Sequence, residues 1–228
     1  MRHVTHAKRT PVPPAPAHPR RADKRGRRAQ IIDAAFREFA AHGFEATRLD
    51  DLARRAGVAK GTIYLYFRDK EDLFRAMVRT FLVPAIEGFR VSASSFSGSA
   101  EELARQLIGH QYARLVTNPK TREILRMLIA ESHRFPQLSE IWYREAFQRS
   151  RRAMRSLLAR RMASGEIRPS RVRDFPWMLG APGMLAVVWK LMFGDRHPLD
   201  LDAWREAHLD LILHGLMARP ARRPRPSH

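Results

Sequence analysis

The spacing of apolar residues is the feature that most restricts the fold of this chain. Between two proline-rich ends, about 190 residues contain only seven prolines, and apolar side chains recur mostly three or four positions apart. That spacing places them on one face of an α-helix. One such stripe consists of Ile31, Ile32, Ala35, Phe36, Phe39 and Ala40. We therefore expect an all-α protein of about nine helices with no strand.

The two ends of the chain carry most of its charge. Of the formal net charge of +19, residues 1–28 contribute +8 and residues 219–228 contribute +4, whereas residues 29–73 carry −1. Eight of the fifteen prolines also lie in these ends. Because the interior of a helix does not tolerate proline, we expect residues 1–26 and 219–228 to form disordered basic tails.

The composition excludes several classes of protein. The absence of cysteine rules out disulfide scaffolds, cysteine zinc sites and thiol nucleophiles, and it favours a cytoplasmic location. No apolar run approaches the roughly 18 residues of a membrane span, and we expect neither a secretory signal nor a membrane partner. The ten histidines show no metal-ligand spacing, so we expect no metal and no cofactor. An enzyme is a weaker alternative, because the common nucleophile, zinc and nucleotide motifs are missing.

Residues 49–67 predict two short helices separated by a sharp turn. Ala53 is small enough for the helices to cross closely, and Gly57 permits the positive φ of the turn. We expect a capping box from Thr47 to Asp50 to begin the first helix. Four residues would fill the space beneath: Leu49, Leu52, Val58 and Ile63. Five others would face outward from the second helix, as hydrogen-bonding groups and flat rings suited to a DNA major groove: Lys60, Gly61, Thr62, Tyr64 and Tyr66. The alternative is an ordinary helical hairpin whose tyrosines pack in a core.

The same stretch resembles the DNA-binding signature of the tetracycline-repressor (TetR/AcrR) family of bacterial transcriptional regulators. The similar segments are residues 43–47, 52–53, 56–58, 60–67 and 70–73. One departure is Ala59, where the family commonly places a serine that caps the recognition helix, and losing that cap costs about 1 kcal/mol. Residues 74–218 are similar to the family's ligand-binding half mainly in size and helix pattern.

The resemblance implies a domain organisation and a set of DNA contacts. Residues 27–73 would form a three-helix DNA-binding domain of helix-turn-helix type, and residues 74–218 a larger effector-binding and dimerisation domain. The implied phosphate contacts come from Thr47, Arg48, Tyr66 and Lys70. The implied base contacts come from Lys60, Thr62 and Tyr64, with Gly61 beside them.

The resemblance also implies the function. Such a protein would be a homodimeric, ligand-responsive repressor that binds a palindromic operator in double-stranded DNA and is released by a small apolar or aromatic effector. The rival interpretation is nonspecific binding to DNA or to another anionic surface through the basic tails. It predicts that removing residues 1–26 abolishes binding, whereas changes at Thr62 and Tyr64 do little.

Two further sets of residues are candidates for the effector half. Candidates for the pocket lining are aromatic, sulfur-containing or isolated polar residues: Phe81, Phe89, Tyr112, Met127, Glu131, Trp142, Tyr143, Trp177 and Met178. Candidates for the dimer interface are apolar residues of the last two expected helices: Val188, Trp189, Met192, Leu209, Ile212, Leu213 and Leu216. For each of these residues the alternative is plain burial in the core of one subunit.

Overall fold

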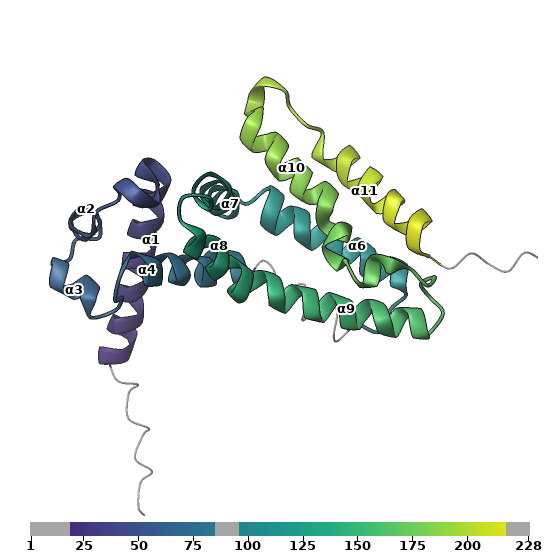
Figure 1. Cartoon of the computed structure of the whole chain (residues 1–228), viewed down its shortest axis with the longest axis horizontal. Coiled ribbons are helices and arrows are strands. Elements are labelled where there is room, and N and C mark those ends of the chain that lie inside the picture. Colours follow the sequence, from purple (N-terminus) through teal and green to yellow (C-terminus); the bar gives the residue numbers. More distant parts are fainter. Residues whose placement is uncertain (1–18, 85–95, 218–228) are drawn as a thin grey trace, which may run out of the picture.

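The structure is a computed structural model that describes residues 19–84 and 96–217, and this part of the chain is helical (Figure 1). It contains no β-strand and one isolated bridge, between Ile167 and Met217. The amino-terminal helices are α1 (Pro19–Ala46), α2 (Leu49–Arg55), α3 (Lys60–Tyr64) and α4 (Lys70–Met77). The other helices are α6 (Ala100–Gln111), α7 (Pro119–Glu131), α8 (Pro136–Trp142), α9 (Gln148–Ala163), α10 (Ala181–Met192) and α11 (Leu201–Leu216).

Short π-helical turns extend or join several of these helices. The turn Val78–Leu82 continues α4, the turn Tyr112–Val116 continues α6, and the turn Tyr143–Phe147 joins α8 to α9 in one long helix. Between α9 and α10 the chain forms two 3-10 turns, Arg171–Arg173 and Pro176–Gly180. With α8 and α9 counted as one helix, the described residues form nine helices. The predicted all-α fold is confirmed.

Several helix ends follow directly from the local sequence. Asp69 caps α4 by accepting a hydrogen bond from the backbone N–H of Asp72 at 2.7 Å. Asn118 caps α7 in the same way, with Pro119 in its first turn. Gly43 takes a φ of +78° and breaks α1, as its position after His42 predicts.

Three details differ from the sequence prediction. Helix α1 begins at Pro19, so residues 19–26 of the expected tail are helical, because proline is compatible with the first helical turn. The predicted capping box at Thr47 is wrong: its hydroxyl donates to the carbonyl of Gly43 at 2.7 Å, and the N-cap residue is Arg48, with no side-chain cap. Helix α3 ends at Tyr64 rather than at Phe67.

The hydrophobic core is continuous across the expected domain boundary at residue 73. The ring of Phe44 lies 5.5 Å from that of Phe39, 5.9 Å from Phe74 and 5.2 Å from Phe135, measured between centroids. Phe39 and Phe44 belong to α1, on either side of its break at Gly43, whereas Phe74 belongs to α4 and Phe135 directly precedes α8. The amino-terminal helices are therefore packed onto the rest of the molecule rather than tethered beside it.

A second cluster of buried apolar residues holds the other end of the molecule together. It is formed mainly by α6 and α9, with Ile167 and Leu216 beside them. Figure 1 shows α1, α2 and α3 at one end of the molecule and the pair α10 and α11 toward the other. Helices α4, α7 and α8 lie between, where α7 contacts α1 and α4 contacts α8.

Candidate nucleic-acid interface and ligand cavity

Helices α2 and α3 pack as the sequence predicts. Leu52, Ala53 and Ile63 are buried, with exposed fractions of 0%, 4% and 1%. Gly57 takes a φ of +61°, and the N–H of Val58 donates to the carbonyl of Ala53 at 3.0 Å to close the turn. This packing fixes the orientation of α3 from below and leaves its other face to solvent.

The outer face of α3 is open. Lys60 and Gly61 are exposed, Thr62 is half-buried, and Tyr64 is 51% exposed. A Cβ added at Gly61 would meet no atom within 4 Å, so the backbone there is accessible to a large partner. Leu65, which the sequence pattern did not single out, is 82% exposed at the end of the helix. Its position between Tyr64 and Tyr66, within the segment 60–67 that resembles the family signature, is the signal that could have identified it.

The ammonium group of Lys60 pairs with a carboxylate of the preceding helix. Its Nζ lies 2.9 Å from Oδ1 and 3.0 Å from Oδ2 of Asp50. A hydrogen bond from Lys60 to Asp50 raises the pKa of Lys60, so the side chain is charged at neutral pH. To contact a base, Lys60 must leave this exposed pair, and exposed pairs of this kind are weak.

The four expected phosphate contacts lie in different environments. Arg48 is exposed, whereas Thr47 is 2% exposed and its hydroxyl is engaged with Gly43. The Nζ of Lys70 donates to the carbonyls of Phe44 and Glu45, both at 2.9 Å, and lies 5.0 Å from the ring centroid of Phe44. Through these two hydrogen bonds, Lys70 anchors the end of α1 to the start of α4. Tyr66, the fourth residue, is half-buried.

A cavity of about 630 Å³ lies among α6, α9, α10 and α11, beside the turn Pro176–Gly180. This volume falls within the usual range for small-molecule sites, and most lining side chains are aliphatic. Leu107, Leu158 and Ile212 are typical of the wall. The polar lining residues are His110, Gln111, Ser150, Arg151 and Arg161.

Two of the nine residues expected to line a pocket, Trp142 and Trp177, line this cavity. Five others lie elsewhere among the described residues: Phe81, Met127, Glu131, Tyr143 and Met178. Tyr112 is buried behind the wall, where its hydroxyl lies 3.2 Å from Nδ1 of His208. Phe89 lies outside the described residues.

The residues expected at a dimer interface divide into three groups. Val188, Ile212 and Leu216 line the cavity. Leu209 is 5% exposed, and Trp189 and Leu213 are half-buried. Met192 is 60% exposed. Two other apolar residues of the same pair of helices are also exposed, Leu185 at 52% and Leu211 at 67%. Leu185, Met192 and Leu211 are thus the large apolar residues of α10 and α11 that are more than half exposed, and Leu185 also lines the cavity.

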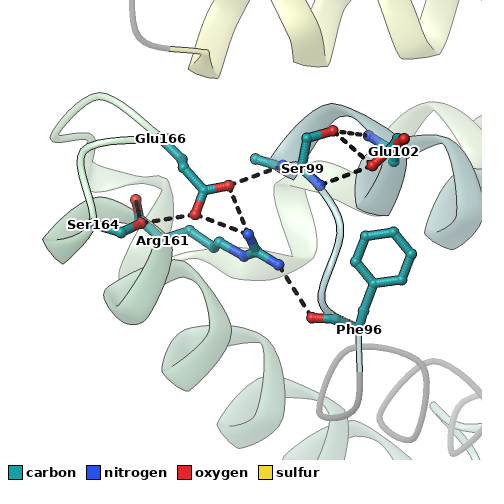
Figure 2. Close-up of polar contacts among 7 residues, drawn as sticks. Phe96, Ser99, Glu102, Arg161, Ser164 and Glu166 are labelled. Carbon is teal, nitrogen blue, oxygen red and sulfur yellow. Dashed lines mark hydrogen bonds and ion pairs between the residues drawn. The ribbon is translucent and has the colours of Figure 1, made fainter.

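One cavity-lining residue, Arg161, belongs to a network of polar contacts (Figure 2). Arg161 donates from Nη1 to both carboxylate oxygens of Glu166, at 2.8 and 2.6 Å, and from Nη2 to the carbonyl of Phe96 at 3.4 Å. Glu166 also accepts from the hydroxyl of Ser164 at 2.9 Å and from the N–H of Ala100 at 3.1 Å. Hydrogen bonds from Arg161 and Ser164 lower the pKa of Glu166. Sequence reasoning missed this network because it joins residues 161–166 to residues 96–100, which lie about 65 positions away in the chain.

Metal and membrane sites do not appear among the residues that the structure describes. Within residues 19–84 and 96–217, no group of three or more histidine or acidic side chains could hold a metal ion. No helix within those ranges is long and apolar enough to cross a membrane.

Comparison with family models places both halves of the chain among transcriptional regulators. Residues 31–77 match the model of bacterial regulatory proteins of the tetR family. Residues 104–173 match the model of the carboxy-terminal domain of AefR-like transcriptional repressors. The first match contains α2, α3 and α4, and the second contains most of the cavity-lining residues of α6 and α9.

Individual relatives are also regulators rather than enzymes. The chain is 36% identical over 87 residues to the fatty acid metabolism regulator protein of Bacillus subtilis. This alignment covers 38% of this chain and 45% of that protein. It is 35% identical over 101 residues to the transcriptional regulator TtgR of Pseudomonas putida, which covers 44% of this chain and 48% of that protein. The chain thus spans about half the length of the curated relatives it matches.

Solved structures resemble the chain over most of its length. The regulator FadR of Bacillus subtilis, solved in complex with stearoyl-CoA, superimposes with a TM-score of 0.66 at 25% identity. That match covers 82% of this chain and 98% of the FadR chain.

Proposed function

Because this chain belongs to the TetR family of bacterial regulatory proteins, we propose that it is a repressor that binds a palindromic DNA operator as a homodimer and releases it when a small apolar or aromatic effector binds. The observation that carries the DNA-binding part is the outer face of α3. There Lys60, Gly61 and Tyr64 are exposed over the buried packing of Leu52 and Ile63. A short helix held from below, with polar and aromatic groups above, fits a major groove.

The surface of α10 and α11 supports the homodimer. Leu185, Met192 and Leu211 are each more than half exposed. Large apolar side chains exposed on neighbouring helices are a feature of interaction sites. A twofold axis through these helices would pair each helix with its counterpart and present two α3 helices to one face of DNA. The grooves that they must reach lie about 34 to 36 Å apart.

The cavity supports a small-molecule effector. Its volume of about 630 Å³ and its aliphatic wall favour a ligand with a substantial apolar part. The solved complex of the related FadR with stearoyl-CoA supports the same conclusion. Helix α7 contacts both α1 and α10, so a change in the shape of the cavity has a direct path to the amino-terminal helices.

Selection from random DNA tests this proposal. The purified full-length protein is incubated with a random duplex library at moderate salt, and the bound DNA is amplified and sequenced. We expect one palindromic motif with half-sites about one helical turn apart. Recovery of no motif contradicts the proposal and favours binding through the basic tails.

Substitutions locate the residues that read the site. Tyr64→Ala should weaken binding to the selected site by roughly tenfold or more, since a good base contact contributes about 1 to 3 kcal/mol. Tyr143→Ala is the matched control, because Tyr143 is also exposed but lies on the turn before α9. Unchanged specific binding in Tyr64→Ala contradicts the assignment of α3.

A further inference from the structure

Two arginines of α9 line the mostly apolar cavity, and they differ in how their charge is balanced. Arg151 and Arg161 are ten residues apart on this helix, which corresponds to about 15 Å along its axis. They therefore belong to opposite ends of the cavity. The charge that a ligand would meet depends on what each guanidinium already contacts.

The charge of Arg161 is already neutralised within the protein. Its side chain is 15% exposed, and both carboxylate oxygens of Glu166 accept hydrogen bonds from it. Figure 2 shows that the same carboxylate also contacts Ser164, so the pair is part of a closed network. This end of the cavity presents no unbalanced charge, and breaking the pair would leave a buried charge without a partner.

Arg151 has no such partner among the residues that the structure describes. Its guanidinium carbon lies 5.7 Å from the ring centroid of Trp177, and no described carboxylate lies within ion-pairing distance of it. The acidic residues that flank α9 in the chain pair elsewhere. Glu145 lies 2.6 Å from Arg79 and 3.9 Å from Arg149, and Asp174 lies 3.7 Å from Arg155.

Aromatic rings contact one another and the ring of Trp177 beside this unbalanced charge. The ring of Phe147 lies 5.8 Å from that of Trp142 and 5.5 Å from that of Trp177, and all three residues line the cavity. The indole N–H of Trp142 is buried and makes no hydrogen bond to any described residue. That nitrogen is inaccessible to solvent, so the polar group that this end of the cavity offers to a ligand's acceptor atoms is the Arg151 guanidinium.

We propose that the cavity binds an amphipathic anion with one carboxylate: the carboxylate pairs with Arg151 at the aromatic end, and the apolar tail extends along α9 toward Leu158 and Leu216. This proposal rests on the effector site proposed above and adds the charge class and orientation of its ligand. Arg161, at the far end, is already paired with Glu166 and takes no part in binding the carboxylate.

Three probes that share one tail test the charge requirement. Dodecanoate, 1-dodecanol and dodecyltrimethylammonium are titrated into the full-length protein without DNA, below their micelle-forming concentrations. Tryptophan fluorescence reports binding, because two of the four tryptophans, Trp142 and Trp177, line the cavity. We expect dodecanoate to bind roughly tenfold more tightly than 1-dodecanol, and the cation to bind most weakly. Equal affinities for the acid and the alcohol would overturn the proposal.

Substitutions on α9 test the position of the carboxylate. Arg151→Met should weaken dodecanoate binding by roughly tenfold while leaving 1-dodecanol within about twofold. Arg152→Met is the matched control, because Arg152 is exposed on the same helix and does not line the cavity, and it should bind both probes like the wild type. If Arg151→Met keeps the preference for dodecanoate, the assignment of Arg151 is wrong.

A third variant separates binding from folding. Arg161→Met should lower the melting temperature yet keep the preference for dodecanoate, because Arg161 is already paired with Glu166. If that variant loses the preference, the carboxylate binds at the Arg161 end and the proposed orientation is wrong. Since these titrations contain no DNA, failure of operator binding leaves the result standing. Failure of the titrations likewise leaves operator binding untouched.

Discussion

Glu131 of α7 lies directly against Gly43 at the break in α1. Its Oε1 accepts a hydrogen bond from the N–H of Phe44 at 3.3 Å, and a Cβ added at Gly43 would lie 2.6 Å from the same oxygen. Beside it, Arg134 donates to Glu45 at 2.6 Å. The end of α7 is thus fastened to the last residues of α1, just before α2.

A double-mutant cycle tests this contact. Gly43→Ala should lower the free energy of unfolding by about 1 to 3 kcal/mol, because its φ of +78° and ψ of 173° are available almost only to glycine. Glu131→Ala alone should lower it by about 0.5 to 1.5 kcal/mol through loss of the hydrogen bond. Denaturant unfolding of both single variants and of the double variant provides the measurement.

The two losses should not add. In Gly43→Ala the new methyl group displaces Glu131, so removing Glu131 from that variant has a smaller effect than in the wild type, by about 0.5 kcal/mol or more. Glu140→Ala is the control, because Glu140 is exposed and pairs with Arg144 on its own helix. Its effect on the free energy of unfolding should add to that of Gly43→Ala. Additive losses for the pair at 43 and 131 would show that the contact does not form.

The N-cap of α3 provides a stabilising prediction. Ala59 already has the extended backbone of a cap, with φ −66° and ψ 147°, but no side chain caps the helix. Ala59→Ser should raise the free energy of unfolding by about 1 kcal/mol, measured by denaturant titration. Ala207→Ser, at an exposed position inside α11, should give no gain because serine is a weaker helix former than alanine. An unchanged or lower value for Ala59→Ser refutes the prediction.

The burial of His208 predicts that stability depends on pH. It is 2% exposed, its Nε2 donates to the carbonyl of Leu179 at 2.8 Å, and burial lowers its pKa below the ordinary 6.5. The unfolded chain therefore binds a proton on this histidine at a higher pH than the folded chain does. The stabilisation is fully present above pH 6.5 and declines as the pH falls toward the lower folded-state pKa, by at most about 1.4 kcal/mol per pH unit.

Unfolding curves recorded from about pH 7.5 down to about pH 5, on both sides of the ordinary histidine value of 6.5, measure that decline. His208→Gln should flatten the dependence on pH, whatever its effect on stability at neutral pH. His214→Gln serves as the control, since that side chain is 80% exposed and should leave the slope unchanged. A slope that survives in His208→Gln would assign the effect to other groups.

Charges placed on α10 and α11 test the proposed dimer. Met192→Glu and Leu211→Glu should each shift the protein toward monomer, because the interface would bury an unpaired carboxylate. Sedimentation velocity at several concentrations measures the shift. Ile129→Glu on α7, at a residue that is 63% exposed, should leave the association unchanged. Dimers of normal strength in both variants would place the interface elsewhere.

Local patterns predicted the helices because their causes are local. Asp69, Asn118 and Gly43 act on residues within one turn, so the sequence alone indicates where helices start and end. Thr47 shows the limit of such patterns. Its hydroxyl had two acceptable roles, and burial against Gly43 decided between them.

The cavity could not be predicted in the same way. Periodicity shows that Val188, Ile212 and Leu216 face something apolar, but not whether that is a second subunit, a core or a cavity. The answer depends on how α6 and α9 pack against α10 and α11. Arg151 was overlooked for a related reason, since its unbalanced charge is evident only once the pairs of Glu145 and Asp174 are known.

The most direct test compares the contribution of α3 with that of the amino-terminal tail. Equilibrium binding to the selected operator and to a scrambled duplex of equal length is measured at moderate salt for three proteins: the wild type, Tyr64→Ala and a variant without residues 1–18, which precede α1. We predict that Tyr64→Ala loses the preference for the operator, whereas the truncated protein keeps that preference with weaker overall affinity. The opposite pattern, with specificity kept in Tyr64→Ala and binding abolished by the truncation, would contradict the assignment of α3 as the reading helix.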